Sequence, residues 1–299
     1  HFEPMRDGIR IRFRIDGNLV EAMSYDMSIY TAIIARLKII SGMDISEKRK
    51  PQDGRTTMDI DHVEYDVRVS SIPTVYGEKI VMRLTNKEKL TRDKRELGLS
   101  DDDMKRFDQM LAHPHGIILV TGPTGSGKST TLYTALSELN RETVNIVTVE
   151  DPVEANIDGV NQIQVNPKAD MTFASALRSI LRQDPDIIMV GETRDAETAS
   201  ISVRAAITGH LVFSTLHTND SVSSVIRLVD MGLEPYMIAN SLVGVVAQRL
   251  MRKVCPYCAQ AEEPTEEERE FLERDIPKVM RPKGCRYCNN TGYKGRTAI

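Results

Sequence analysis

The chain has 299 residues, of which 40% are hydrophobic and 27% charged, and its formal net charge is −4. This length fits one large domain or two ordinary ones, and the composition is typical of a soluble globular protein. Apolar runs such as 116–120 are far shorter than the ~20 residues of a membrane-spanning helix. The negative charge gives no general reason to expect nucleic-acid binding. The chain begins with His1 and shows no secretory signal, so we expect a piece of a longer protein.

Residues 1–84 predict a small α/β domain with an antiparallel sheet. Residues 9–15 alternate strictly between Ile9, Ile11, Phe13 and Ile15 on one face and Arg10, Arg12 and Arg14 on the other. This pattern predicts a half-buried strand, followed by a hairpin turn at Asp16–Gly17. Residues 28–43 predict a helix that stops at Gly42. Two more strands are expected at 62–73 and 77–84, with Pro73 and Gly77 in their connection. The charged segment 85–96 has no apolar period and predicts a linker.

From residue 97 onward, apolar strands and helices alternate. Strands are expected at 116–122, 145–151, 186–192 and 211–217, with helices from about Ser129, at 172–183 and at 198–209. Beyond Thr218 the pattern turns helical. Such alternation is typical of a mostly parallel sheet with helices on both faces.

The segment GPTGSGKS, residues 122–129, matches the phosphate-loop pattern G-x-x-x-x-G-K-[ST] between an expected strand and helix. Backbone N–H groups of such a loop and the helix N-terminus surround phosphates. Lys128 is expected to reach the β- and γ-phosphates of ATP, and the Ser129 hydroxyl to bind Mg²⁺. The predicted nucleotide-binding residues are Gly122, Pro123, Thr124, Gly125, Ser126, Gly127, Lys128, Ser129 and Thr130.

Acidic residues follow two of the expected strands. Glu192 ends the strand 186–192 as in a Walker B element, although Gly191 precedes a glutamate here instead of the commoner aspartate. Glu150, Asp151 and Glu154 lie at the end of the strand 145–151. Ligands bind at the carboxyl ends of parallel strands, so these acids are candidates for supporting Mg²⁺ and for orienting the attacking water. For any single acid, a solvated loop residue is the alternative.

His210 and His217 flank the last of these strands. His217 lies at the carboxyl end, where it could contact the γ-phosphate, and a purely structural histidine is the alternative.

All four cysteines form two C-x-x-C pairs, Cys255 with Cys258 and Cys285 with Cys288. Beside a phosphate loop, which indicates a reducing compartment, this spacing favours a metal site over disulfides. Four thiolates satisfy tetrahedral zinc and leave no open position, so the expected zinc is structural. Another thiophilic metal could take its place.

The motifs together resemble those of the type II secretion and type IV pilus-assembly ATPases. The segments GPTGSGKSTT, TVEDPVE, DPDIIMVGETRDAETA and TGHLVFSTLHTN match in order, as do RFRIDG, KRKPQDGR and RVSSIPTVYGEKIVMRL nearer the start. HFEP looks like the end of a truncated family motif. The resemblance implies a PAS-like second N-terminal domain at 1–84, a linker at 85–96 and a RecA-like ATPase domain at 97–299. It also implies that 251–295 is a tetracysteine subdomain.

The same resemblance implies roles for residues that spacing cannot assign. Arg68 and Arg83 match arginines that approach the nucleotide from the N-terminal domain, and Arg178, Arg182 and Arg194 match positions that serve subunit contacts and the active site. Glu192 would support Mg²⁺ through water. Glu154 would orient the attacking water, with Glu150 as its competitor.

The family further implies a homo-hexameric motor at the cytoplasmic face of the inner membrane. It would act through an inner-membrane platform protein and other assembly components. The paired cysteines favour the assembly direction, for pilus extension or type II secretion, and are not expected to take part in the chemistry. A RecA-like nucleic-acid translocase and a nucleotide-binding switch without turnover are the alternatives. The first is disfavoured because no aromatic residues interleave with the basic strand.

Overall fold

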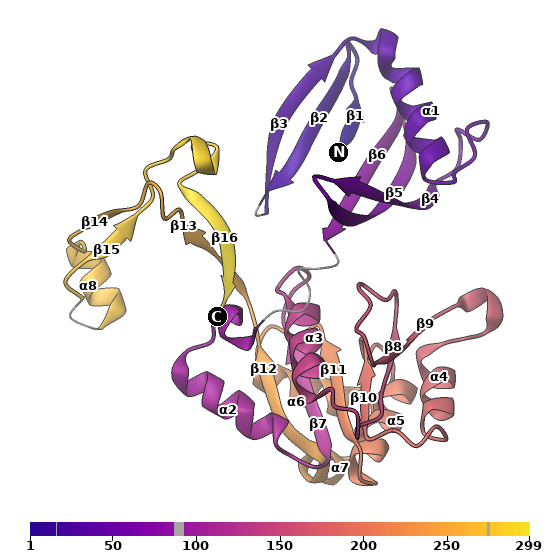
Figure 1. Ribbon diagram of the computed structural model, residues 1–299, viewed down its shortest axis with the longest axis vertical. Helices are drawn as coiled ribbons and strands as arrows, with labels where there is room; N and C mark the ends of the chain where they lie inside the picture. The colour runs from indigo at the N-terminus through magenta and orange to yellow at the C-terminus, as the bar shows by residue number, and fades with distance from the viewer. Residues whose placement is uncertain (16, 87–92, 274–275) are drawn as a thin grey trace. The chain divides into compact units, whose positions relative to one another are not determined.

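The computed structural model describes residues 1–15, 17–86, 93–273 and 276–299 (Figure 1). The chain forms two compact units, His1–Leu90 and Thr91–Ile299. No helix within the described residues is long and apolar enough to cross a membrane.

The first unit is an antiparallel sheet with one long helix. Its strands follow the order β3-β2-β1-β6-β5-β4. The helix α1 (Tyr30–Ile40) packs Ile34 and Leu37 against Val67, Val69 and Ile80 of the sheet. The bounds are β1 (Phe2–Pro4), β2 (Ile9–Ile15), β3 (Asn18–Tyr25), β4 (Gln52–Ile60), β5 (Val63–Thr74) and β6 (Gly77–Asn86), with a 3-10 helix at Met27–Ile29 before α1.

Most expected elements of this unit are present, with three differences. Pro73 lies inside β5 and Gly77 opens β6, so the expected connection shortens to Val75 and Tyr76. The strands β1 and β4 carry no clear apolar pattern and were not expected. On β2, the expected burial holds for Ile9 and Ile11 but not for Phe13 and Ile15, which are 49% and 41% exposed. Asp16 and residues 87–92 of the expected linker lie outside the described residues.

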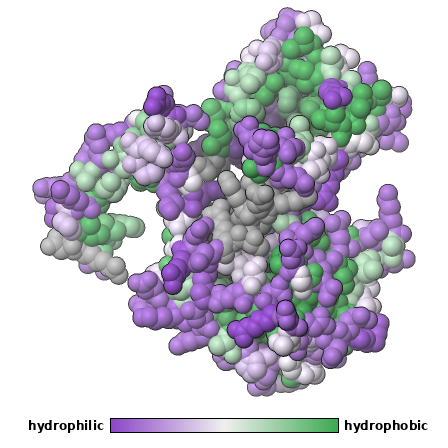
Figure 2. Space-filling model, viewed as in Figure 1, coloured by the Kyte–Doolittle hydropathy of each residue, from purple (hydrophilic) through white to green (hydrophobic). Residues whose placement is uncertain are grey.

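A buried ion pair joins α1 to the sheet. Lys38 is 1% exposed and pairs with Glu78, while its Nζ also donates to the Glu47 carbonyl at 2.7 Å. Ser71 Oγ donates to Glu78 Oε1 at 3.2 Å. These contacts satisfy two charges that would be costly to bury alone. On the visible surface of this unit, apolar residues gather (Figure 2).

The second unit contains a parallel six-stranded sheet in the order β12-β7-β11-β10-β8-β9 (Figure 1). All of its strand pairs are parallel, which confirms the predicted fold class. The sheet strands are β7 (Gly116–Thr121), β8 (Ile146–Glu150), β9 (Asn161–Gln164), β10 (Ile187–Val190), β11 (Leu211–Leu216) and β12 (Leu242–Ala247).

Helices pack on this sheet from both sides. Ile117 and Leu119 of β7 point into a core shared with the helices α4, α5, α6 and α7, whereas α3 packs against β7 from the other face. Gly244 of β12 leaves room for Met110 of α2. The helices are α2 (Asp101–Leu111), α3 (Lys128–Leu139), α4 (Phe173–Ile180), α5 (Ala196–Ile207), α6 (Ser221–Asp230) and α7 (Pro235–Ser241). The sequence pattern did not predict β9, β12 or α2.

After β12 the chain leaves the sheet as an arm that carries the cysteines. Its base is the antiparallel pair β13 (Leu250–Val254) and β16 (Tyr293–Ala298). Farther out lie the pair β14 (Gln260–Glu262) and β15 (Val279–Arg281) and the helix α8 (Glu266–Leu272). We call residues 250–299 the tetracysteine arm.

Candidate nucleotide site and metal centre

The phosphate loop joins β7 to the N-terminus of α3. Its conformation depends on glycine, because Gly122 has a φ of 142° and a side chain there would lie 2.3 Å from the Gln248 carbonyl oxygen. Gly127, with a φ of 90°, caps α3. The loop residues 123–125 are exposed, as a phosphate site requires. This arrangement fits the expected nucleotide phosphates.

The side chain of Lys128, the first residue of α3, forms hydrogen bonds with the phosphate loop. Its Nζ donates to the carbonyl oxygens of Gly122 at 2.8 Å and Pro123 at 3.1 Å. Burial lowers the pKa of the Lys128 ammonium, and the negative charge of Glu192 opposes that shift. The charge of Glu192, which follows β10, therefore favours the charged form of the lysine. Ser129 follows directly and is exposed.

Two predicted site residues, Arg194 and His217, meet at the Glu192 carboxylate. This carboxylate is mostly buried, forms an ion pair with Arg194, and lies 3.4 Å from His217 Nε2. Arg194 also lies 4.0 Å from Asp151, which links the two acidic clusters. Glu192 follows β10 and His217 follows β11, so adjacent parallel strands bring them together.

Hydroxyl groups hold the backbone on either side of Glu192. Thr215 Oγ1 donates to the Gly191 carbonyl at 2.7 Å, and the Thr193 N–H donates to the Thr215 carbonyl at 3.0 Å. Thr193 and Ser214 also share a hydrogen bond of 2.8 Å between their hydroxyls. These bonds fix the turn that presents the Glu192 carboxylate.

The other acidic cluster is organised by Tyr133, which sequence reasoning did not single out. The Tyr133 hydroxyl, on α3, donates to Glu150 and accepts from the Glu154 N–H at 3.1 Å. Glu150 is 3% exposed and also accepts from Thr148 at 2.6 Å and Gln162 at 3.1 Å. Burial and the neighbouring Glu150 charge raise the pKa of Tyr133, so the phenol stays protonated. The helix that begins at the phosphate loop thus contacts both acids.

Arg68 and Arg83, in the first unit, lie opposite each other on β5 and β6, and Arg55 lies opposite Arg68 on β4. Directly paired residues point to the same face of a sheet, so the three arginines form a cross-strand row. Arg55 pairs with the buried Asp66 at 2.5 Å, and Arg68 lies 3.7 Å from the same carboxylate. Like charges in such a row repel one another, and the Asp66 carboxylate offsets part of this repulsion. Register is not readable from sequence, so Arg55 was missed.

Arg178 lies on α4, and Arg182 follows one turn later, just after the helix ends. Arg178 pairs with Glu197 of α5, and Arg182 Nη1 donates to the Arg178 carbonyl at 2.9 Å. The predicted interface role of this pair stays a prediction.

The basic strand β2 is largely neutralised within its own unit. Glu3 accepts from Arg12 through both of its oxygens at 2.8 Å, and it lies 3.3 Å from Arg10 and 3.1 Å from Lys79. Hydrogen bonds from Arg12 lower the pKa of Glu3 to about 2, although burial opposes the shift. Arg14 instead donates to the Gly17 carbonyl at 2.6 Å.

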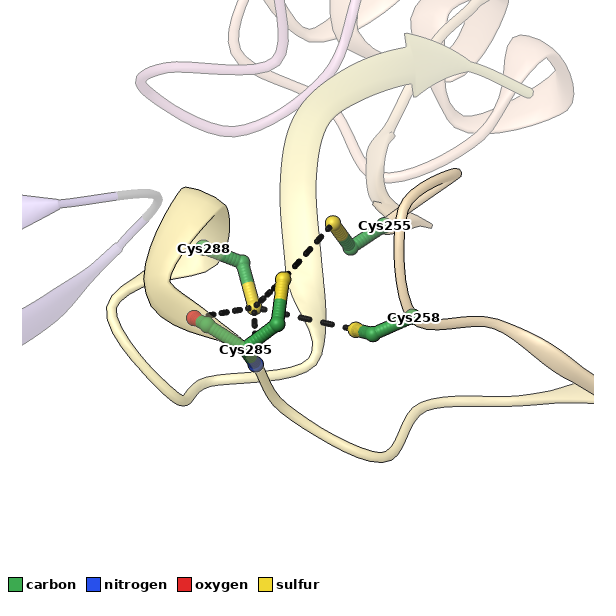
Figure 3. Close-up of side chains that lie close together, drawn as sticks. All are labelled: Cys255, Cys258, Cys285 and Cys288. Carbon is green, nitrogen blue, oxygen red and sulfur yellow. Dashed lines mark hydrogen bonds between the residues drawn. The ribbon is translucent and has the colours of Figure 1, made fainter.

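The four cysteine sulfurs point toward one another in the arm (Figure 3). All lie within 4.8 Å of one another, and three of the separations are 3.9 Å for Cys255–Cys285, 3.8 Å for Cys258–Cys288 and 3.7 Å for Cys285–Cys288. A tetrahedral zinc ion bound to sulfur at about 2.3 Å requires sulfur separations of about 3.8 Å. The cluster therefore fits the expected zinc.

Backbone donors also prepare the cluster for a metal. The N–H groups of Cys285 and Gly292 each lie 3.2 Å from the Cys288 sulfur. Burial alone would raise the pKa of the Cys288 thiol, but these donors and the neighbouring thiols lower it to about 6. A ligand thiol must lose its proton to bind zinc, so the donors favour the binding form.

Comparison with known proteins places these features in one family. Residues 1–299 match the family model described as Type II/IV secretion system protein. The chain belongs to this family. Its relatives include the type II secretion system ATPase E of Vibrio cholerae, with 51% identity over 302 residues, and the type II secretion system protein HxcR of Pseudomonas aeruginosa, with 50% identity over 299 residues. All of this chain is covered in both, but it spans only 60% and 61% of their lengths.

Two solved structures have a similar fold. The pilus retraction motor PilT with bound ADP has 29% identity and a TM-score of 0.61, over 84% of this chain and 76% of that one. The Legionella pneumophila ATPase DotB shares the fold at 24% identity, with a TM-score of 0.61 over 91% of this chain and 80% of that one. The family resemblance and the RecA-like fold inferred from the sequence are thus confirmed.

Proposed function

We propose that the chain is the motor part of an ATPase that hydrolyses ATP with Mg²⁺ to drive pseudopilin assembly in type II protein secretion. This choice over pilus extension is supported by relatives named for type II secretion, which are 51% and 50% identical to this chain over its whole length. The observation that carries the proposal is the phosphate loop after β7, with the Glu192 carboxylate after β10 at the same carboxyl edge of the parallel sheet.

Each site residue then has a physical task. Backbone N–H groups of the loop and the Lys128 ammonium bind the phosphates, and the exposed Ser129 hydroxyl binds Mg²⁺, which neutralises charge on the β- and γ-phosphates when bound. Glu192 supports that ion through water. His217 and Arg194 orient the Glu192 carboxylate and bring positive and polar groups near the γ-phosphate.

Glu154 is the better candidate for orienting the attacking water. The Glu150 carboxylate is buried and accepts hydrogen bonds from Tyr133, Thr148 and Gln162. These bonds occupy the carboxylate oxygens and leave them little access to a water beside the phosphate. Glu154 is only half-buried. We assign Glu150 the task of holding the Asp151–Glu154 segment through Tyr133.

We further propose that the protein works as a homo-hexamer. The row of Arg55, Arg68 and Arg83 offers the positive charge that could complete a nucleotide site, as an arginine finger does. A separate surface that supports association with a second copy is the outer face of α6. There Val222, Val225, Ile226 and Val229 form a helical stripe and are between 36% and 69% exposed.

Other partners in this proposal are an inner-membrane platform protein and further secretion components, with the motor at the cytoplasmic face. A structural zinc ion would fix the tetracysteine arm. A nucleic-acid translocase is a weaker alternative, because Arg10 and Arg12 pair with Glu3 and do not form a free basic track.

Turnover per subunit, measured against concentration of the full-length protein, tests the motor proposal. We expect specific activity to rise with concentration, and a double variant Arg68→Ala, Arg83→Ala to inhibit the wild type when mixed. Arg49→Ala, at an arginine that is 87% exposed in the same unit, serves as the control. Activity that is independent of concentration and of mixing would refute catalysis between subunits. An active protein whose turnover responds to single-stranded DNA would favour the translocase.

A further inference from the structure

Gln248 lies between the sheet and the tetracysteine arm. It follows β12 and is only 3% exposed. Its backbone N–H donates to the Thr121 carbonyl at 2.8 Å, which extends the β12–β7 pairing to the start of the phosphate loop. A buried amide side chain needs partners for its polar atoms.

Both polar atoms of the Gln248 side-chain amide form hydrogen bonds with the phosphate loop and α3. Nε2 donates to the Ser126 carbonyl at 2.8 Å, within the phosphate loop. Oε1 accepts from Thr131 Oγ1 at 2.7 Å, on α3. The Thr131 N–H in turn donates to the Gly127 carbonyl at 3.1 Å. One amide therefore connects the loop to the first turn of the helix that follows it.

The next residues form the root of the arm. Arg249 and Ile299 exchange two backbone hydrogen bonds of 3.0 and 2.9 Å, and Leu250 then opens β13. A Cβ placed on Gly127 would lie 2.7 Å from Gln248 Nε2 and 3.4 Å from Leu250 Cδ2. The phosphate loop thus packs directly against the root of the arm.

We propose that Gln248 is a positioning residue that holds the phosphate loop in its nucleotide-binding conformation and couples that loop to the root of the tetracysteine arm. The hydrogen bond from Gln248 to the Ser126 carbonyl holds the backbone of the loop in place for phosphate binding. Any ligand that orders the loop then also stabilises β13 and β16, and the coupling acts equally in both directions. This inference rests on the proposed nucleotide site.

The test uses the full-length protein and a fluorescent ADP analogue with Mg²⁺. Gln248→Met keeps the length of the side chain but removes both hydrogen bonds, and should weaken binding about tenfold. Gln260→Met, at an exposed glutamine of β14, is the matched control and should bind like the wild type. Zinc content should be unchanged in both variants. Equal affinity in Gln248→Met and the wild type would overturn the positioning role.

A second pair of variants covers the case in which Gln248→Met does not fold. Thr131→Val removes the hydroxyl that donates to Gln248, whereas Thr131→Ser retains it. We expect Val to weaken nucleotide binding and Ser to restore affinity close to that of the wild type. Equal binding by these two variants would also contradict the inference.

Hydrogen exchange tests the coupling itself. Bound nucleotide should slow amide exchange in residues 250–254 and 293–298 of the wild type, and should have no such effect in Gln248→Met. Equal slowing in both proteins, or none in the wild type, would overturn the coupling. If the wild type bound no nucleotide at all, the proposed function would fail; if only the Gln248 and Thr131 effects were missing, this inference alone would fail.

Discussion

Replacing Tyr133 with Phe tests whether one hydroxyl organises the acidic cluster. The change removes a hydrogen bond to the Glu150 carboxylate and the 3.1 Å acceptor of the Glu154 N–H. A hydrogen bond to a charged group contributes ~1.5–3 kcal/mol, and an ordinary one ~0.5–1.5 kcal/mol. Glu150 keeps Thr148 and Gln162 as donors, so the total loss should be about 3 kcal/mol in the free energy of unfolding.

Urea unfolding followed by circular dichroism measures that loss. Tyr236→Phe is the matched control, because Tyr236 is 66% exposed on α7, and it should unfold like the wild type. Hydrogen exchange of residues 150–156 should also speed up in Tyr133→Phe, and ATP turnover should fall because Glu154 is less well placed. A destabilisation below about 1 kcal/mol, with unchanged exchange in this segment, would refute the organising role of the hydroxyl.

Three further predictions address the loop, the metal and pH. Lys128→Ala should abolish ATP turnover with the unfolding midpoint nearly unchanged, and full activity in a steady-state assay would contradict the phosphate-loop assignment. Cys285→Ser should release zinc, as measured by atomic absorption, and speed exchange in the outer arm. Nucleotide affinity should stay within about twofold, because the root pair β13–β16 is held by its own backbone ladder. The pKa of Glu3 falls from 4.5 to about 2 because Arg12 donates to it, so its carboxylate stabilises the first unit above pH 4.5 and this stability is lost as the pH drops toward 2. In Glu3→Gln the midpoint of unfolding should depend less on pH across that range. A pH dependence equal to that of the wild type would exclude this contribution.

The sequence predicted best where a pattern repeats or a motif has fixed spacing. The continuous apolar strands before Gly122 and Glu192 identified the parallel sheet, and the paired cysteines were correctly expected to meet. The strand β12 was missed because its apolar run, 242–247, follows two helices, and short apolar runs do not distinguish strand from helix. The edge strand β4 is largely exposed, so little apolar alternation marks it.

Contacts between distant segments were the hardest to foresee. Tyr133 and Gln248 belong to no motif, and their importance comes from partners 17 and 122 residues away, Glu150 and Ser126. A buried polar residue at the end of an apolar run, such as Gln248 after 242–247, is the only signal that sequence offered. The row formed by Arg55 depends on strand register, which hydrophobic pattern sets only where one face is clearly buried.

The three-residue strand β1 has a consequence for anyone who shortens this chain. Phe2–Pro4 lies between β2 and β6 and pairs with both, so it joins the β2–β3 hairpin to the β4–β6 portion of the sheet. The buried Glu3 on this strand also binds Arg12 of β2 and Lys79 of β6, one from each side. Deleting only these residues would leave a hairpin without its neighbour in the sheet, and two exposed strand edges prone to aggregation. Expression boundaries should therefore be placed upstream of Phe2 wherever the first unit is retained.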